Sequence, residues 1–472
     1  MPLLARLPHN VQHMIFELCG DPLPWRYTTV CELARRMNCD PFFDGTLSLD
    51  EIHTWSRRRV PTLSQTLDRG QPSEAHGSRL ELPVAEVSSE GYILLVVDSQ
   101  GLRDILRVAE LVDSPGFRSE KLRFISGPAE SFSGFFVDFK YGLARLIVPP
   151  GRQVQVWESE VPPNSQMIID PAGPSPDLAP HTSLFFAASH FVSIDLEKCD
   201  GLTVFSSPHG VLGIHAHTRE SPHAMKTYEA LRPPQLRQSA VWSYVPLLPN
   251  DEVLSLGLRF QCSQGTRWLP SLIIRLQSGQ YTIGPWYDPE DGPAEDYTFQ
   301  VRGRPTLVYG APTHYSIPRL TVLPQTAVSK DVKTLEAKRP PLLVNPHFSS
   351  APLENIRKVS VFSDGSPGFC RGMLITYTDL TKRVVGECRW GLQPVVVYEN
   401  PSRLFYYQGQ HSAQNVTTSV TPPFEVADVA FESKDFIPPA SCHGEGWRSC
   451  ELRGDLHFWV NARESHLTVH QA

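Results

Sequence analysis

The sequence lacks the patterns that would place it in a membrane or outside the cell. No stretch approaches the roughly 20 apolar residues that a helix needs to cross a bilayer. The opening MPLLARLPHNVQHMIFELCG has neither the basic start nor the apolar run of a secretory signal. The 9 cysteines are odd in number and include no Cys-x-x-Cys pair. We therefore expect an intracellular protein, cytoplasmic or nuclear, with reduced thiols and no membrane partner.

An excess of positive charge is also missing. The 472 residues carry 43 Lys and Arg against 50 Asp and Glu, a formal net charge of −7. Nucleic-acid-binding surfaces usually concentrate basic residues on one face. The short run Arg57-Arg58-Arg59 is interpreted as a solvated helix end. We expect no nucleic-acid partner.

Sequence motifs of catalysis are absent as well. The chain contains no GxSxG, no phosphate-binding loop, no HExxH and no GxGxxG after a strand. The acidic segment 287–297 lies among Pro and Gly, which favours a solvated loop over a calcium site. Cys442, His443 and Cys450 lack a fourth ligand for zinc. The sequence predicts no enzyme, no catalytic residues, no cofactor and no metal.

Proline and glycine, in contrast, are abundant. The chain has 43 Pro and 31 Gly, and the segments between them are rich in valine, threonine and aromatics, which is typical of short strands joined by turns. The sequence predicts a mainly β fold with a small N-terminal α-helical module and a body that is a β-sandwich or β-prism-like. Turns between paired strands are expected at Ser99–Gly101, Tyr141–Gly142, Pro208–Gly210, Ser278–Gly279 and Asp364–Gly368.

Helical periodicity is confined to the first sixty residues. Two short amphipathic helices are expected before residue 40, and a third one through LSLDEIHTWSRRR, 47–59. Pro-rich seams at 162–180 and 335–352 suggest domain boundaries. The expected organisation is a helical module at 1–60, a linker at 61–90, a β region at 91–170, a β domain at 181–335 and a C-terminal β domain at 350–472.

Four histidines lie close together in VFSSPHGVLGIHAHTRESPH, 204–223. In a strand, His215 and His217 point to the same face. A metal site needs a third ligand, which neither His209 nor His223 supplies at a familiar spacing. The pattern favours an ordinary half-buried strand with a polar outer face. It leaves open a face on which His215 and His217 contact a ligand.

The N-terminal segment resembles an F-box. The resemblance lies in Leu7-Pro8, followed by Val11, Ile15 and Leu18 and then by Val30-Cys31 and Leu33. It implies a helical hook that docks in a groove of the adaptor subunit of a ubiquitin ligase. The residues expected to make this contact are Leu7, Pro8, Val11, Ile15 and Leu18.

The rest of the chain resembles a family of filamentous-fungal proteins that begin with an F-box-like segment. The resemblance lies in FKYGLARL, GLTVFSSPHGVLGIHAHT, VWSYVPL, TIGPW and ITYTDLTKRVVGECRWG. Within it, residues 356–387 are similar to the strand set of a jacalin-type β-prism, a fold that implies sugar binding.

Two functions follow from these resemblances. The first is a non-enzymatic adaptor, whose F-box-like module recruits the ligase core while the β-rich body binds an unknown protein target. The alternative is a stand-alone β-prism-type protein that binds a glycan or another ligand.

Overall fold

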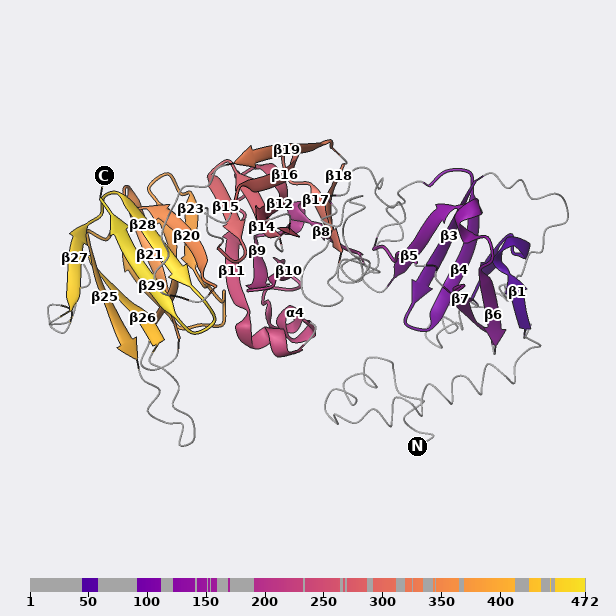
Figure 1. Ribbon diagram of the computed structural model, residues 1–472, viewed down its shortest axis with the longest axis horizontal. Helices are drawn as coiled ribbons and strands as arrows, with labels where there is room; N and C mark the ends of the chain where they lie inside the picture. The colour runs from indigo at the N-terminus through magenta and orange to yellow at the C-terminus, as the bar shows by residue number, and fades with distance from the viewer. Residues whose placement is uncertain are drawn as a thin grey trace, which may run out of the picture. The chain divides into compact units, whose positions relative to one another are not determined.

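The computed structural model describes residues 45–57, 91–111 and 122–158, the single residue 169, and most of 191–471, with short gaps inside these ranges. The chain divides into two units, Met1–Pro162 and Pro163–Ala472. Antiparallel strands dominate the described part of both units (Figure 1). The mainly β fold predicted from the sequence is therefore confirmed. The first two predicted helices lie outside the described residues.

The first unit is built on one seven-stranded sheet. Its strand order is β1-β6-β7-β4-β3-β5, and β2 pairs with β4 off this path. The elements are β1 (Gly45–Ser48), the 3-10 turn η2 (Leu49–Glu51), β2 (Trp55–Ser56), β3 (Tyr92–Asp98), β4 (Gly101–Val108), β5 (Arg123–Pro128), η4 (Ala129–Phe132), β6 (Phe136–Lys140) and β7 (Leu143–Ile147).

The third predicted helix, at 47–59, is wrong. Residues 45–56 instead form β1, the single turn η2 and β2, and they pair with β6 and β4. Ser48 and Glu51 form a capping box at the start of η2, and this 3-10 turn ends after three residues. Leu49, Ile52 and Trp55 are buried in the core of the sheet. Their spacing of three suits a helix, but burial against β4 and β6 decides the conformation, so the helical module cannot extend to residue 60.

The second unit opens with three sheets. Their orders are β10-β9-β11, β18-β17-β8 and β15-β14-β12-β16-β19, with β13 beside β12. The elements are β8 (Phe191–Asp195), η6 (Leu196–Lys198), β9 (Gly201–Ser207), β10 (Gly210–His217), α4 (Met225–Ala230), η7 (Pro234–Ser239), β11 (Val241–Pro246), β12 (Val253–Ser263), β13 (Thr266–Arg267), β14 (Ser271–Leu276), β15 (Gly279–Ile283), β16 (Ala294–Gln300), β17 (Thr306–Gly310), β18 (Leu320–Leu323) and β19 (Val328–Lys333).

The described part of the second unit holds two further sheets. One has the order β24-β21-β22-β26-β25-β27, with β23 beside β22, and the other has the order β20-β28-β29. The elements are β20 (His347–Pro352), β21 (Ile356–Asp364), β22 (Phe369–Tyr377), β23 (Lys382–Gly386), β24 (Val395–Glu399), β25 (Arg403–His411), β26 (Phe424–Glu432), β27 (Trp447–Glu451), β28 (Asp455–Val460) and β29 (Ser465–His470). Side chains from both sheets share one core.

The predicted boundary at 335–352 does not separate two cores. Phe362, Leu374 and Cys388, which lie after it, belong to the same buried cluster as Leu258 and Ile274, which lie before it. The predicted domains 181–335 and 350–472 therefore fall within one unit. The proline-rich segment at 335–352 connects strands of two sheets within one unit. Prolines suit such short connections as well as linkers between domains.

The predicted hairpins are confirmed. The strand pairs β3–β4, β6–β7, β9–β10, β14–β15 and β21–β22 form as predicted, while residue 141 and residues 365–368 in two of the expected turns lie outside the described residues. Gly101 and Gly210 have positive φ angles of 111° and 96°, which a side chain tolerates poorly. The turn chemistry of the sequence thus located these pairs correctly.

Candidate functional site

The residues expected to dock the ligase adaptor subunit lie outside the described residues. These are Leu7, Pro8, Val11, Ile15 and Leu18. The described functional candidates are the two histidines of β10, a pocket in the second unit, and the apolar side chains that remain exposed.

His215 and His217 lie side by side on β10, as the i, i+2 spacing predicts. Their rings meet edge to face, with centroids 4.7 Å apart. Both side chains are buried, however, because the segment after β10 and helix α4 cover this face. The expected polar outer face is therefore an interior face, and β10 is buried on both sides.

Every ring nitrogen of the two histidines has a partner within the chain. His215 Nε2 lies 3.1 Å from the Ser221 carbonyl oxygen and its Nδ1 lies 2.8 Å from Thr227 Oγ1. His217 Nδ1 lies 2.8 Å from the Pro222 carbonyl oxygen and its Nε2 lies 2.7 Å from Thr203 Oγ1. Each carbonyl requires a ring N–H donor, so the second nitrogen accepts from a threonine hydroxyl. Neither ring retains a nitrogen for a ligand.

The same surroundings keep both rings neutral. Burial, helped by the neighbouring His217, lowers the pKa of His215 from 6.5 to about 4. Burial likewise lowers the pKa of His217. Because a charged imidazolium is disfavoured away from water, the pair fastens the segment after β10 rather than exchanging protons near neutral pH. Its chemistry is structural.

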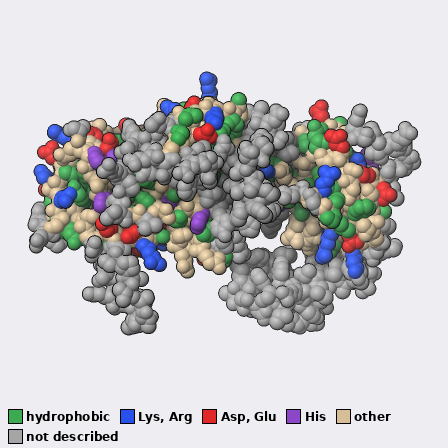
Figure 2. Space-filling view, viewed as in Figure 1, with side chains coloured by type: hydrophobic (Ala, Val, Ile, Leu, Met, Phe, Trp, Pro, Cys, Tyr) green, Lys and Arg blue, Asp and Glu red, His purple; other side chains and the backbone are tan. Residues whose placement is uncertain are grey.

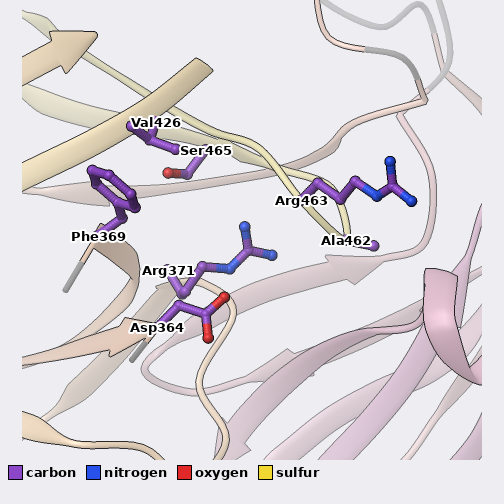
Figure 3. A pocket seen from close by; sticks show the side chains of 7 residues that line it. All are labelled: Asp364, Phe369, Arg371, Val426, Ala462, Arg463 and Ser465. Carbon is purple, nitrogen blue, oxygen red and sulfur yellow. The ribbon is translucent and has the colours of Figure 1, made fainter. Parts of the chain in front are cut away.

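A pocket of about 240 Å³ opens beside the β21–β22 hairpin and the β28–β29 turn. Its lining residues are Asp364, Phe369, Arg371, Val426, Ala462, Arg463 and Ser465. In Figure 3, Arg371 reaches into the space between Asp364 and Ser465, whereas the guanidinium of Arg463 points away from the others. A ring, a carboxylate and a hydroxyl therefore surround a small opening.

Most of the donors of Arg371 are already used. Its guanidinium contacts Glu387 Oε2 at 2.6 Å, the Asn461 carbonyl oxygen at 2.5 Å and the Glu464 carbonyl oxygen at 3.3 Å. Glu387 is completely buried, and its Oε1 also accepts a hydrogen bond from Arg389 Nε at 2.9 Å. Arg371 thus braces the β28–β29 turn, and little of its charge remains for a ligand.

Burial governs the chemistry of three described thiols, Cys199, Cys370 and Cys388. Burial raises the pKa of Cys199 to about 11 and also raises the pKa of Cys370 and of Cys388. Such thiols are poor nucleophiles because the thiolate is the reactive form. Among the residues that the structure describes, no three His, Cys, Asp or Glu side chains are grouped so that they could hold a metal ion.

Among the described residues, exposed large apolar side chains cluster in two places, while others, such as Val332 and Leu380, are exposed singly. In the first unit, Phe136 and Ile147 are cross-strand neighbours on the outer face of β6 and β7, each 43% exposed. In the second unit, half-exposed side chains cluster between residues 390 and 397: Trp390, Leu392, Val395, Val396 and Val397. On the face shown in Figure 2, side chains of both charges are interspersed with hydrophobic ones. Phe136 and Ile147 lie on paired strands, whereas the second cluster runs from the turn that holds Trp390 and Leu392 into strand β24.

The second cluster ends in an edge strand. β24 pairs only with β21 in the described part of the chain, in an antiparallel register that sets Val396 opposite Val361 and Tyr398 opposite Val359. Val395, Val396 and Val397 are 42%, 46% and 48% exposed. Because side chains alternate along a strand, Val395 and Val397 lie on one face of β24 and Val396 on the other. Exposed apolar side chains at a sheet edge are typical of protein contacts.

Comparison with known proteins gives this chain no family. No protein-family model matches it, and no curated protein matches it either. No helix among the described residues is both long and apolar enough to cross a membrane.

Sequence reasoning missed both the pocket and the edge strand. The pocket joins residues about a hundred positions apart, from β21 to β29, which no local pattern reveals. The edge strand did leave a signal in PVVVYENP, 394–401. Three valines bracketed by prolines are typical of a strand that borders its sheet, since proline cannot donate to a neighbouring strand.

Proposed function

We propose that this protein is a non-enzymatic adaptor whose F-box-like N-terminal segment recruits a ubiquitin-ligase core while the β-rich body binds a protein. The observation that supports this is the placement of the exposed apolar side chains. They gather on the outer face of β6–β7 and along residues 390–397, on open surfaces rather than in an enclosed cavity. Flat apolar surfaces suit protein partners, whereas small substrates are usually held in concave sites.

The ligase contact is assigned to Leu7, Pro8, Val11, Ile15 and Leu18, on the resemblance to an F-box. Burying three aliphatic side chains of an amphipathic helix contributes about 1.5–3 kcal/mol each at most, and association and helix ordering offset much of this. A contact of micromolar strength follows. A charge at Ile15 would be left unpaired in the groove and would abolish it.

The test is a pull-down of the ligase adaptor subunit by the full-length chain and by its Ile15→Asp variant, with Val332→Asp as a control. Val332 is 64% exposed on β19, far along the sequence from the F-box-like segment. We expect wild type and Val332→Asp to retain the subunit and Ile15→Asp to lose it with an unchanged thermal melt. A wild-type chain that retains no adaptor subunit would overturn the proposal.

The pocket beside the β28–β29 turn favours the alternative, a β-prism-type protein that binds a glycan. Phe369 and Asp364 offer a ring and an acceptor to a sugar, whereas Ser465 is buried and its Oγ accepts from Ala427 N–H at 3.0 Å. The volume of about 240 Å³ suits only one small residue of a glycan, and Arg371 is already engaged. Glycan-array binding that is lost in Asp364→Ala would support this second function over the first.

A further inference from the structure

The free edge of β24 has a defined hydrogen-bonding pattern. The Pro394 carbonyl oxygen accepts from Ser363 N–H at 3.2 Å, and Asn400 N–H donates to the Arg357 carbonyl oxygen at 2.6 Å. In an antiparallel pair the residues that bond to the neighbouring strand alternate with residues whose N–H and C=O point away. Val396 and Tyr398 therefore bond to β21, and the backbone groups of Val395, Val397 and Glu399 point outward. None of the described residues bonds to them.

This edge carries fewer charged side chains than two other edge strands of the same unit. Edge strand β19 holds Lys330, Asp331 and Lys333, and edge strand β27 holds Arg448 and Glu451. Charged side chains on an edge strand discourage another strand from adding to the sheet. Between Pro394 and Pro401, β24 offers three valines, a tyrosine and one terminal glutamate.

We propose that a second copy of this chain adds to the sheet through β24, antiparallel to the first β24 and related to it by a twofold axis at Val397. This inference goes beyond the adaptor function and does not depend on it. The exposed apolar cluster on the first unit remains available to a different protein.

The register follows from the outward backbone groups. Only the alignment centred on Val397 uses all three outward residues of each copy: Val397 faces Val397 of the second copy, and Val395 faces its Glu399. Two hydrogen bonds in each of the three pairs make about six in total. Shifting the alignment by two residues leaves one outward residue of each copy without a partner. The prolines on either side limit further sliding, because they cannot donate.

The charges permit this symmetric pairing. Glu399 faces a valine rather than another carboxylate, and its Oε1 is already paired with Lys358 Nζ at 2.8 Å. The two Glu399 side chains stand four residues apart along the strands, about 14 Å at ~3.4 Å per residue. That exceeds the Debye length of about 8 Å at physiological salt, so their repulsion is screened.

Val397 is the residue that tests the register, because it lies opposite its own copy. Val397→Lys places two like charges across the axis, and Val397→Glu does the same with the opposite sign. The half-exposed side chain and outward N–H of Val397 leave the fold of one chain tolerant of both changes. A mixture of the two variants puts Lys opposite Glu and restores pairing.

The experiment is sedimentation velocity of the full-length chain from about 5 to about 100 μM. A five-residue strand pair is a small interface, so we expect wild type to shift from monomer toward dimer over this range. We expect each single Val397 variant to weaken the dimer at least about tenfold, and a 1:1 mixture to recover a dimer of near wild-type strength.

Matched variants at Val396 provide the control. Val396 would lie opposite Tyr398 of the second copy and not opposite itself. Mixing Val396→Lys with Val396→Glu should therefore rescue much less than the mixture at position 397, while thermal melts confirm that all four variants are folded. A wild-type chain that stays monomeric at about 100 μM overturns the proposal. The β24 edge would then be open to a different protein. Dimers that are indifferent to charge at Val397, or equal rescue at both positions, overturn the proposal too.

Discussion

Acid should lower the unfolding free energy of the second unit, because its buried histidines resist protonation. The size of this effect can be worked out for His215. The perturbation is a fall in pH from 7 to 4. The pKa of His215 is lowered to about 4 by burial and by His217, against 6.5 in an unfolded chain. As the pH falls below 6.5, His215 becomes protonated in the unfolded state, whereas in the folded state it becomes protonated only near pH 4. Stability is therefore fully present above pH 6.5 and is lost progressively between pH 6.5 and 4.

The size of the loss follows from the shift. Each pKa unit corresponds to about 1.4 kcal/mol, so His215 accounts for about 3 kcal/mol across this window. His347, whose pKa is also lowered to about 4 by burial, and His217, lowered in the same direction, add to it. Replacing His215 with Gln removes one of these groups and should reduce the slope of unfolding free energy against pH by up to about 1 kcal/mol per unit near pH 5.

The assay must report on the second unit alone, because two units can unfold in separate transitions. Hydrogen exchange of peptides from 201–217, measured in rising urea at pH 7, 6 and 5, meets this need. His209→Gln is the control, because it makes the same substitution at an exposed position in the β9–β10 turn, and it should change the slope less than His215→Gln does. A His215→Gln chain with the wild-type pH slope would refute the reasoning.

Two other perturbations test the described interior. Glu387→Gln leaves the buried Arg371 without its counter-charge and should lower the unfolding free energy of the second unit by about 3–5 kcal/mol. The control is Glu451→Gln, which breaks the exposed pair with Arg453 and should change the unfolding free energy in urea by less than about 1 kcal/mol. Equal effects of the two variants would contradict the burial argument. In native protein at pH 8, an alkylating reagent should modify the half-buried Cys450 well before Cys199, Cys370 and Cys388, because full burial suppresses the thiolate. Site-resolved mass spectrometry measures the order of modification. Early modification of Cys388 would contradict the prediction.

Local patterns in the sequence predicted much of the strand content. Hairpins such as β3–β4 and β14–β15 were found because Gly101 and Gly279 close turns that only glycine adopts easily. The segment 47–59 was assigned wrongly, since Leu49, Ile52 and Trp55 satisfy a helical period but are buried by strands far away in the sequence. Periodicity records which residues are apolar and not which element covers them.

The candidate site was less predictable. The spacing of His215 and His217 placed both rings on one face, but only the fold shows that Ser221, Pro222 and Thr227 close over them. The importance of Val397 depends on two long-range facts, the pairing of β24 with β21 and the absence of a described strand on its other side. Neither follows from the residues between Pro394 and Pro401 alone.

The adaptor function is tested most directly by titrating the purified ligase adaptor subunit into the full-length chain in a calorimeter. We expect wild type and Val397→Lys to bind it with the same affinity, micromolar or tighter, because the ligase contact and the β24 edge are separate surfaces. We expect Ile15→Asp to give no binding heat while its body still folds. A wild-type chain that binds no adaptor subunit, or an Ile15→Asp chain that binds as well as wild type, would contradict the account.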